Sequence, residues 1–178
     1  MKRMRSVPLA IGIGIVATIL LLLAAGAPPL EAMQVIFDGA FGNTSRISAT
    51  LMAWVPLVLA AAGLLITFQA GVWNIGVEGQ IVMGAIGAAW VARSVPVPSV
   101  VVIPLTLLGG ALLGAAWALL PAWLRTRFRV HEIFSGVALS FVAASVAVYL
   151  IIGPWSRAGI ASTSGTDLFG ERTWLPEV

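Results

Sequence analysis

Long apolar runs separated by short polar segments dominate the pattern along the chain. Four of these runs carry no charged residue, at 8–27, 51–70, 99–120 and 133–152. A helix needs about 20 apolar residues to cross the ~30 Å hydrocarbon core of a bilayer, and each run has that length. The pattern therefore predicts an all-α polytopic membrane protein.

The stretch "GVWNIGVEGQIVMGAIGA" breaks this pattern, because it places Asn74 and Glu78 ahead of the next apolar run. As a helix, that uncharged run of residues 81–92 would be only ~18 Å long, too short to cross the membrane. We therefore predict that the span absorbs the polar residues before it and covers 74–93. This gives about five transmembrane helices.

A helical wheel of this span separates large apolar residues from small ones. The large ones share an arc of about 100°, which we expect to face lipid: Ile75, Val82, Met83, Ile86 and Trp90. A second arc holds Gly76, Gly79, Gly84, Gly87 and Gln80. Gly110 and Gly114 in the next run have the spacing that lets helix backbones approach closely. We expect a helix wedged between neighbours, with Glu78 turned toward protein or a cavity.

Glu78 has two interpretations. In the first, Glu78 does no more than begin a helix. Asn74 is a good N-cap, and an acid in the first turn suits the positive end of the helix dipole. Alternatively, an ionisable group at membrane depth marks a substrate or ion path. The periodicity leaves both open.

The N-terminal run resembles a signal peptide, but its apolar part is longer than the usual ~7–15 residues, so we expect an uncleaved first span. The segment 28–50 is mixed, with Leu30, Met33 and Phe37 at helical spacing. It could lie partly flat on the interface or form an ordinary external loop. The polar segment 153–178 is predicted to be an external loop.

Composition agrees with a membrane protein, because 60% of the residues are hydrophobic and only 10% are charged. The formal charge of +3 comes without a long basic run, so we predict no nucleic-acid partner. Basic residues gather at the N-terminus and in "LRTRFRVHE". With five spans these lie on one side, which predicts a cytoplasmic N-terminus. We interpret Arg125, Arg127 and Arg129 as topology anchors, and His131–Glu132 as a solvated helix start with an Arg129–Glu132 pair.

Catalytic and metal-binding patterns are missing from the sequence. The chain has no cysteine and one histidine, and "GVEG" lacks the Gly-Lys-Ser/Thr ending of a phosphate loop. We therefore predict no catalytic residue, metal site or cofactor.

Two motifs carry a family resemblance. The stretch "FQAGVWNIGVEGQIVMGAIGAAW" resembles the "GLFNIGxEGQ…GA" signature of ATP-binding-cassette importer permeases. The group is the branched-chain amino acid/ribose-type family, nearest its nucleoside and simple-sugar branch. "RTRFRVHEIFSGVALSFVAASVAVYLIIGP" resembles a second motif of that branch, with His131 where asparagine is usual. With a weaker third match, the resemblance covers most of the chain from Phe37 onward.

The resemblance implies a translocation pathway for nucleosides or simple sugars, with branched-chain amino acid transport or a non-transporting scaffold as alternatives. The matching positions include candidate pathway residues, Asn74, Gly76, Glu78, Gly79 and Gln80. A cytoplasmic-face motif holds Arg125, Arg127, Arg129, His131 and Glu132. Implied partners are cytoplasmic ATP-binding subunits, a second permease chain and an extracytoplasmic binding lipoprotein at a bacterial plasma membrane. Family members are about twice as long, so residues 1–178 are expected to be the N-terminal part of one permease domain, an incomplete bundle with a truncated loop.

Overall fold

The computed structural model describes the backbone of residues 2–157, 159 and 165–174, and side chains from residue 8 onward. Contacts divide the chain into two units, 1–59 and 60–178, which are described separately. In the described ranges the elements are helices: α1 (Lys2–Ala24), α2 (Pro29–Phe41), α3 (Thr44–Gln69), α4 (Val77–Ser94), α5 (Ser99–Phe128), α6 (Glu132–Ile152) and a short 3₁₀ turn, η1 (Glu171–Thr173). The all-α prediction is confirmed.

Three described helices, α3, α5 and α6, are long and apolar enough to cross a membrane, and a fourth span is added if the bent pair α1–α2 counts as one. The chain is therefore a multi-pass membrane protein. Helix α4 is not in this set, because its 18 residues include Glu78, Gln80 and Arg93. The count of five spans stays a prediction.

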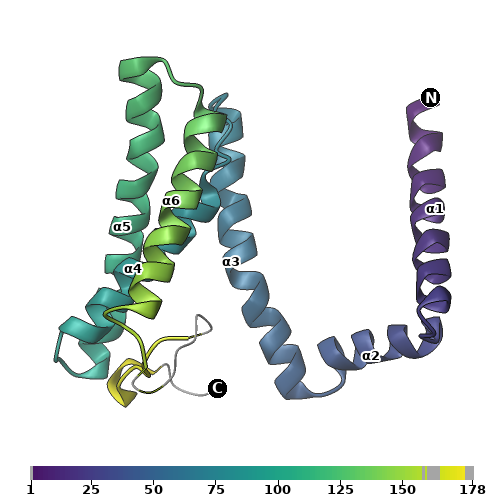
Figure 1. Cartoon of the computed structure of the whole chain (residues 1–178), viewed down its shortest axis with the longest axis horizontal. Helices are drawn as coiled ribbons and strands as arrows, with labels where there is room; N and C mark the ends of the chain where they lie inside the picture. The colour runs from purple at the N-terminus through teal and green to yellow at the C-terminus, as the bar shows by residue number, and fades with distance from the viewer. Residues whose placement is uncertain (1, 158, 160–164, 175–178) are drawn as a thin grey trace. The chain divides into compact units, whose positions relative to one another are not determined.

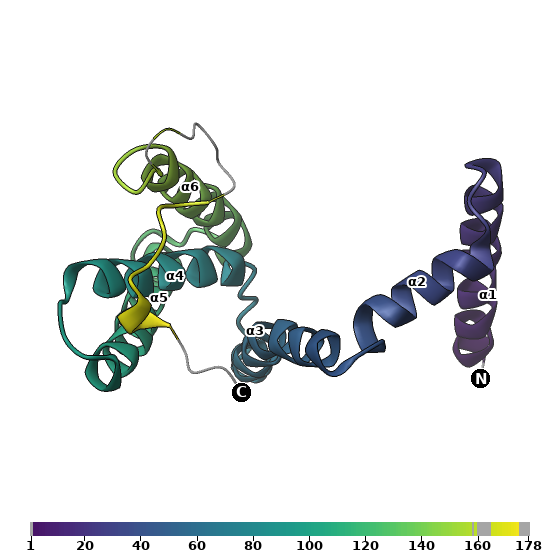
Figure 2. The same ribbon diagram turned by 90° about the horizontal axis from the view of Figure 1, so that it is seen from below.

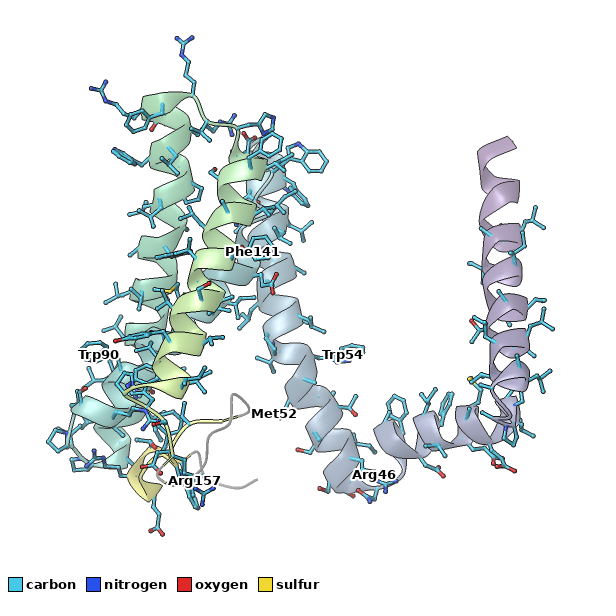
Figure 3. All side chains as sticks on the ribbon, viewed as in Figure 1. Arg46, Met52, Trp54, Trp90, Phe141 and Arg157 are labelled. Carbon is cyan, nitrogen blue, oxygen red and sulfur yellow. The ribbon has the colours of Figure 1, made fainter. Side chains whose placement is uncertain are left out.

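In the first unit, α2 turns by 107° from the axis of α1 at the Pro28–Pro29 break. Arg46 lies at the corner where α2 leads into α3, as Figure 3 shows. Asn43 caps α3 by accepting a 2.9 Å hydrogen bond from the Arg46 amide, and the Arg46 guanidinium donates to the Asp38 carbonyl at 2.7 Å. The segment 28–50 is thus mostly helical, and its interpretation as an ordinary loop is wrong.

In the second unit, α4 lies between α5 and α6 (Figures 1 and 2). Glycines make the contact with α5 possible. A Cβ placed on Gly84 would lie 3.2 Å from the Gly110 carbonyl oxygen, and one on Gly114 would lie 3.1 Å from the Gln80 carbonyl oxygen. Side chains at these positions would force the backbones apart. The predicted close approach at Gly110 and Gly114 is confirmed, and so is the wedged position of α4.

The contact of α4 with α6 also depends on small residues. A Cβ on Gly76 would lie 3.1 Å from the Gly136 Cα. One turn further, the amide of Gly79 donates to Ser140 Oγ at 3.2 Å, while that hydroxyl donates to the Gly136 carbonyl at 3.0 Å. Ser140 therefore satisfies one of the amides that a helix start leaves without an intrahelical partner.

The predicted lipid-facing arc of α4 is partly wrong. Met83 and Ile86 are buried, and with Ala143 of α6 they form the centre of the apolar core. Ile75 and Trp90 are exposed, as that arc requires. Because α4 has a neighbour on two sides, an apolar arc that a wheel assigns to lipid is used partly for protein packing.

Arg93, in the last turn of α4, holds the segment 165–174 against the bundle. Its guanidinium donates to Thr166 Oγ1 at 2.7 Å and to the Asp167 carbonyl at 2.8 Å. The guanidinium carbon also lies 5.3 Å from the ring centre of Trp155 and 4.6 Å from that of Phe169. These are cation–π distances, so Arg93 holds the segment 165–174 through Phe169 as well as through the two hydrogen bonds.

The α4–α5 contact predicts that Gly87→Ala destabilises the protein. The new Cβ would lie 2.5 Å from the Gly109 carbonyl oxygen and 2.8 Å from Leu113 Cβ. We expect a loss of about 1–3 kcal/mol in the free energy of unfolding, the usual cost of overpacking, measured by dodecyl sulfate titration in mixed micelles. Gly63→Ala is the control, since nothing lies within 4 Å of its Cβ position. Equal stability of the two variants would contradict the close contact.

The Arg93 contacts predict that Arg93→Met releases the segment 165–174. Losing hydrogen bonds from a charged donor costs about 1.5–3 kcal/mol, so we expect amide hydrogen exchange there to become roughly tenfold faster or more. Exchange in α5 should not change. Arg157→Met, at an exposed arginine after α6, is the matched control. Unchanged exchange at 165–174 in Arg93→Met would show that other contacts hold the segment.

Candidate functional site

The signature stretch begins with a helix end and a sharp turn. Gly71 has a left-handed backbone, with φ of +71°, and the Val72 amide returns to the Thr67 carbonyl at 2.9 Å. This arrangement closes α3, and glycine adopts it without strain. Residues 72–76 then run without helix to α4, which begins at Val77 with Gly76 as its N-cap. The expectation that Asn74 caps this helix is wrong, because the helix begins three residues later.

Asn74 instead pairs with Gln80 in the first turns of α4. The Asn74 amide nitrogen donates to Gln80 Oε1 at 3.1 Å, and the Gln80 amide nitrogen donates to Asn74 Oδ1 at 2.9 Å. Two half-buried amides therefore satisfy each other, because each carries both a donor and an acceptor. The pair fastens the non-helical segment to the helix that follows it.

These two amides line the signature cavity, a space of about 420 Å³ between the end of α3, the start of α4, α5 and the start of α6. Arg125 and Glu132 line it as well, joined by an ion pair at 3.1 Å. The Glu132 side chain is only 14% exposed, whereas that of Arg125 is 43% exposed. The expected Arg129–Glu132 pair is therefore wrong. Arg129 ends α5 in a left-handed conformation, with φ of +57°, and the partner of Glu132 is Arg125.

The other residues of the predicted cytoplasmic-face motif lie at the surface. Arg127, Arg129 and His131 are exposed. His131 caps α6, since its Nδ1 accepts from the Ile133 amide at 3.4 Å, and the same nitrogen lies 3.6 Å from Glu132 Oε2. The motif thus divides into a pair that lines the signature cavity and three exposed residues.

Glu78 is exposed and lines neither the signature cavity nor the second cavity described below. In the part of the chain that the structure describes, the expectation that its side chain turns toward protein is not met. Residues 4, 7, 11 and 14 positions later share its helical face: Val82, Ala85, Ala89 and Ala92. All four line the second cavity, so Glu78 stands at one end of the cavity-lining face of α4.

This second space, the Trp155 cavity, has a volume of about 660 Å³ and lies between α4, α6 and the segment 165–174. Alanines of α4 form one wall, and Trp155, Phe169 and Trp174 form another. Thr106, Thr166 and Thr173 contribute hydroxyl groups to its lining. Binding sites for small molecules usually have this size and this mixture of apolar surface with a few polar groups.

The structure brings some predicted residues together and separates others. Asn74 and Gln80 meet in the signature cavity, Gly76 and Gly79 serve the contact with α6, and Glu78 lies on another face. Sequence reasoning did not identify the Trp155 cavity. A tryptophan just after an apolar run is typical of the membrane interface, so Trp155 gives no signal of a cavity. The alanines at 85, 88, 89 and 92 are the sequence feature that could have indicated a smooth wall on α4.

Comparison with known proteins identifies relatives of the chain. A glucose ABC transporter permease protein of Haloferax volcanii is 36% identical over 155 residues, which are 87% of this chain and 40% of that protein. A guanosine ABC transporter permease protein of Bacillus subtilis is 32% identical over 146 residues, 82% of this chain and 42% of that protein. A nucleoside ABC transporter permease protein of Lactococcus lactis is 31% identical over 147 residues.

The chain spans about two fifths of the length of these relatives. No solved structure matches it. The family described as the permease component of the branched-chain amino acid transport system matches residues 46–170, which includes the signature stretch and both cavities' helical walls. The chain therefore belongs to the branched-chain amino acid transport system permease family.

Proposed function

We propose that this chain forms part of the membrane pathway of an ABC importer that carries nucleosides or sugars. Family membership and the glucose, guanosine and nucleoside permeases among its relatives support this function. In the proposed assembly, ATP is hydrolysed on separate cytoplasmic subunits, a second permease chain completes the pathway, and an extracytoplasmic binding lipoprotein delivers the substrate. The chain itself carries no catalytic role.

The cavity-lining face of α4 is the observation that carries the proposal. Its cavity-lining residues run from Val82 to Ala92, and Glu78 stands one turn before them on the same helical face. The helix between Glu78 and Ala92 is about 21 Å long, most of the ~30 Å hydrocarbon core. Small side chains keep this face open, and an ionisable group stands at one end of it. We propose that substrate moves along this face, with the signature residues 74–80 at its start.

The chemistry of the Trp155 cavity favours an uncharged substrate. Its lining residues comprise apolar, aromatic and threonine side chains, and none of them is acidic or basic. A branched-chain amino acid is a zwitterion, and burying its two charges without partners is costly. Nucleosides and sugars are neutral, stack on aromatic rings and hydrogen-bond to hydroxyls. This favours them over the amino-acid substrates of the alternative.

We further propose a bacterial plasma membrane location with the N-terminus in the cytoplasm. The basic segments support this orientation, because "MKRMR" and "LRTRFRVHE" hold six of the ten Lys and Arg residues. In this orientation the signature cavity lies toward the cytoplasm, and the segment 165–174 lies outside.

Uptake measurements test the function. The complete gene is expressed with its neighbouring genes in a host lacking nucleoside, glucose and leucine uptake, and labelled guanosine, glucose and leucine are supplied. We expect ATP-dependent uptake of guanosine or glucose but not of leucine. Leucine uptake alone would support the amino-acid alternative. No uptake, together with failure to co-purify the neighbouring ATPase, would support a non-transporting scaffold.

Glu78→Ala tests the proposed start of the pathway. In the proposed pathway the Glu78 carboxylate accepts a hydrogen bond from the passing substrate. Losing such a charge-assisted hydrogen bond costs about 1.5 kcal/mol or more, so we expect initial uptake to fall about tenfold. Glu31→Ala, at an exposed acid of α2, is the matched control and should leave uptake near the wild-type rate. Membrane levels of both variants are compared by immunoblot. Equal, small effects would favour Glu78 as a helix-start residue only.

A further inference from the structure

Helix α2 has an unequal distribution of side chains around its axis. On a helical wheel, six apolar residues fill an arc of about 140°: Leu30, Met33, Ile36, Phe37, Ala40 and Phe41. The polar residues Gln34, Asp38 and Glu31 occupy an arc of about 60° on another side. The rings of Phe37 and Phe41 lie 5.9 Å apart, so the aromatic side chains are neighbours on one face.

The apolar arc of α2 has no cover within the described chain. Leu30 is 72% exposed, Ile36 64%, Phe37 60% and Phe41 57%. An exposed apolar strip of this kind is unfavourable in water and marks an interaction surface.

Length and direction restrict what this surface can contact. Helix α2 has 13 residues, about 20 Å, and cannot cross a ~30 Å core alone. Helix α1 has 23 residues, and the 19 that follow Arg5 are uncharged and about 29 Å long, close to the thickness of the core. The 107° turn between them places α2 nearly perpendicular to α1. If α1 crosses the membrane, α2 lies along its surface.

Two hydrogen bonds join the end of α2 to the first turns of α3. Thr50 Oγ1 donates to the Ala40 carbonyl at 2.9 Å, and Arg46, labelled in Figure 3, donates to the Asp38 carbonyl at 2.7 Å. The direction of α2 is therefore restricted by the turn at its start and by these contacts at its end.

We propose that α2 is an interfacial helix, seated at the boundary between lipid headgroups and acyl chains. Its apolar arc enters the acyl chains, and Glu31, Gln34 and Asp38 face water. Typical interfacial helices have a basic polar face that anionic lipids attract. The polar face of α2 is acidic, so its position at the interface depends on apolar contact with the acyl chains and on its attachment to α1 and α3. We therefore expect α2 to bind zwitterionic and anionic lipid surfaces equally well.

Spin labelling tests the position of α2 in the membrane. Because the chain has no native cysteine, every label is site-specific. Phe37→Cys and Asp38→Cys are matched neighbours, about 100° apart on the helix. Each is labelled in the full chain, reconstituted in phosphatidylcholine vesicles with or without phosphatidylglycerol. Collision rates with oxygen and with a water-soluble nickel chelate give the depth of each label. Leu20→Cys, in α1, is the deep reference.

We expect the label at 37 to collide severalfold more with oxygen and severalfold less with nickel than the label at 38, at a depth shallower than position 20. Anionic lipid should not change this. Met33→Cys and Glu31→Cys repeat the comparison if the first pair folds poorly, as judged by circular dichroism. Both labels in water would place α2 outside the membrane. Both labels at the depth of position 20 would indicate a broken span, and shielding from both reagents would indicate a protein cover. Each of these three results overturns the proposal.

Discussion

Backbone contact between α4 and its two neighbours is the constraint on which the second unit depends. Lipid is as apolar as a leucine side chain, so burial alone does little to hold helices together in a membrane. Close packing of the helix backbones therefore has to stabilise the contacts. Here glycines of α4 lie against glycines of α5 and α6. The positions of both cavities follow from this packing, because α4 forms a wall of each.

The contacts of α4 also explain how a short, polar-tipped helix keeps its place among longer ones. Its first turn lacks a side-chain cap, yet Ser140 of α6 satisfies the Gly79 amide. Its last turn ends in Arg93, a charge that would be costly in hydrocarbon without partners. Two aromatic rings and two oxygen acceptors surround that guanidinium. Neighbouring elements thus supply at both ends what α4 lacks by itself.

Local pattern predicted much of the fold, including the helices near 99–120 and 133–152 and the close approach at Gly110. It failed where a residue's surroundings come from distant segments. A wheel cannot tell lipid from protein, so Met83 was assigned outward although α6 covers it. Spacing along one helix suggested Arg129 as the partner of Glu132, but a left-handed turn brings Arg125 there instead. The Trp155 cavity includes residues more than 70 positions away from α4 along the chain.

The mutual amide pair of Asn74 and Gln80 has a consequence for the environment in which the protein works. Neither amide gains or loses a proton at any physiological pH, and each supplies both a donor and an acceptor to the other. The start of α4 is therefore fastened in the same way in acidic and alkaline surroundings. A pH difference across the membrane therefore leaves the hydrogen bonds of this junction unchanged.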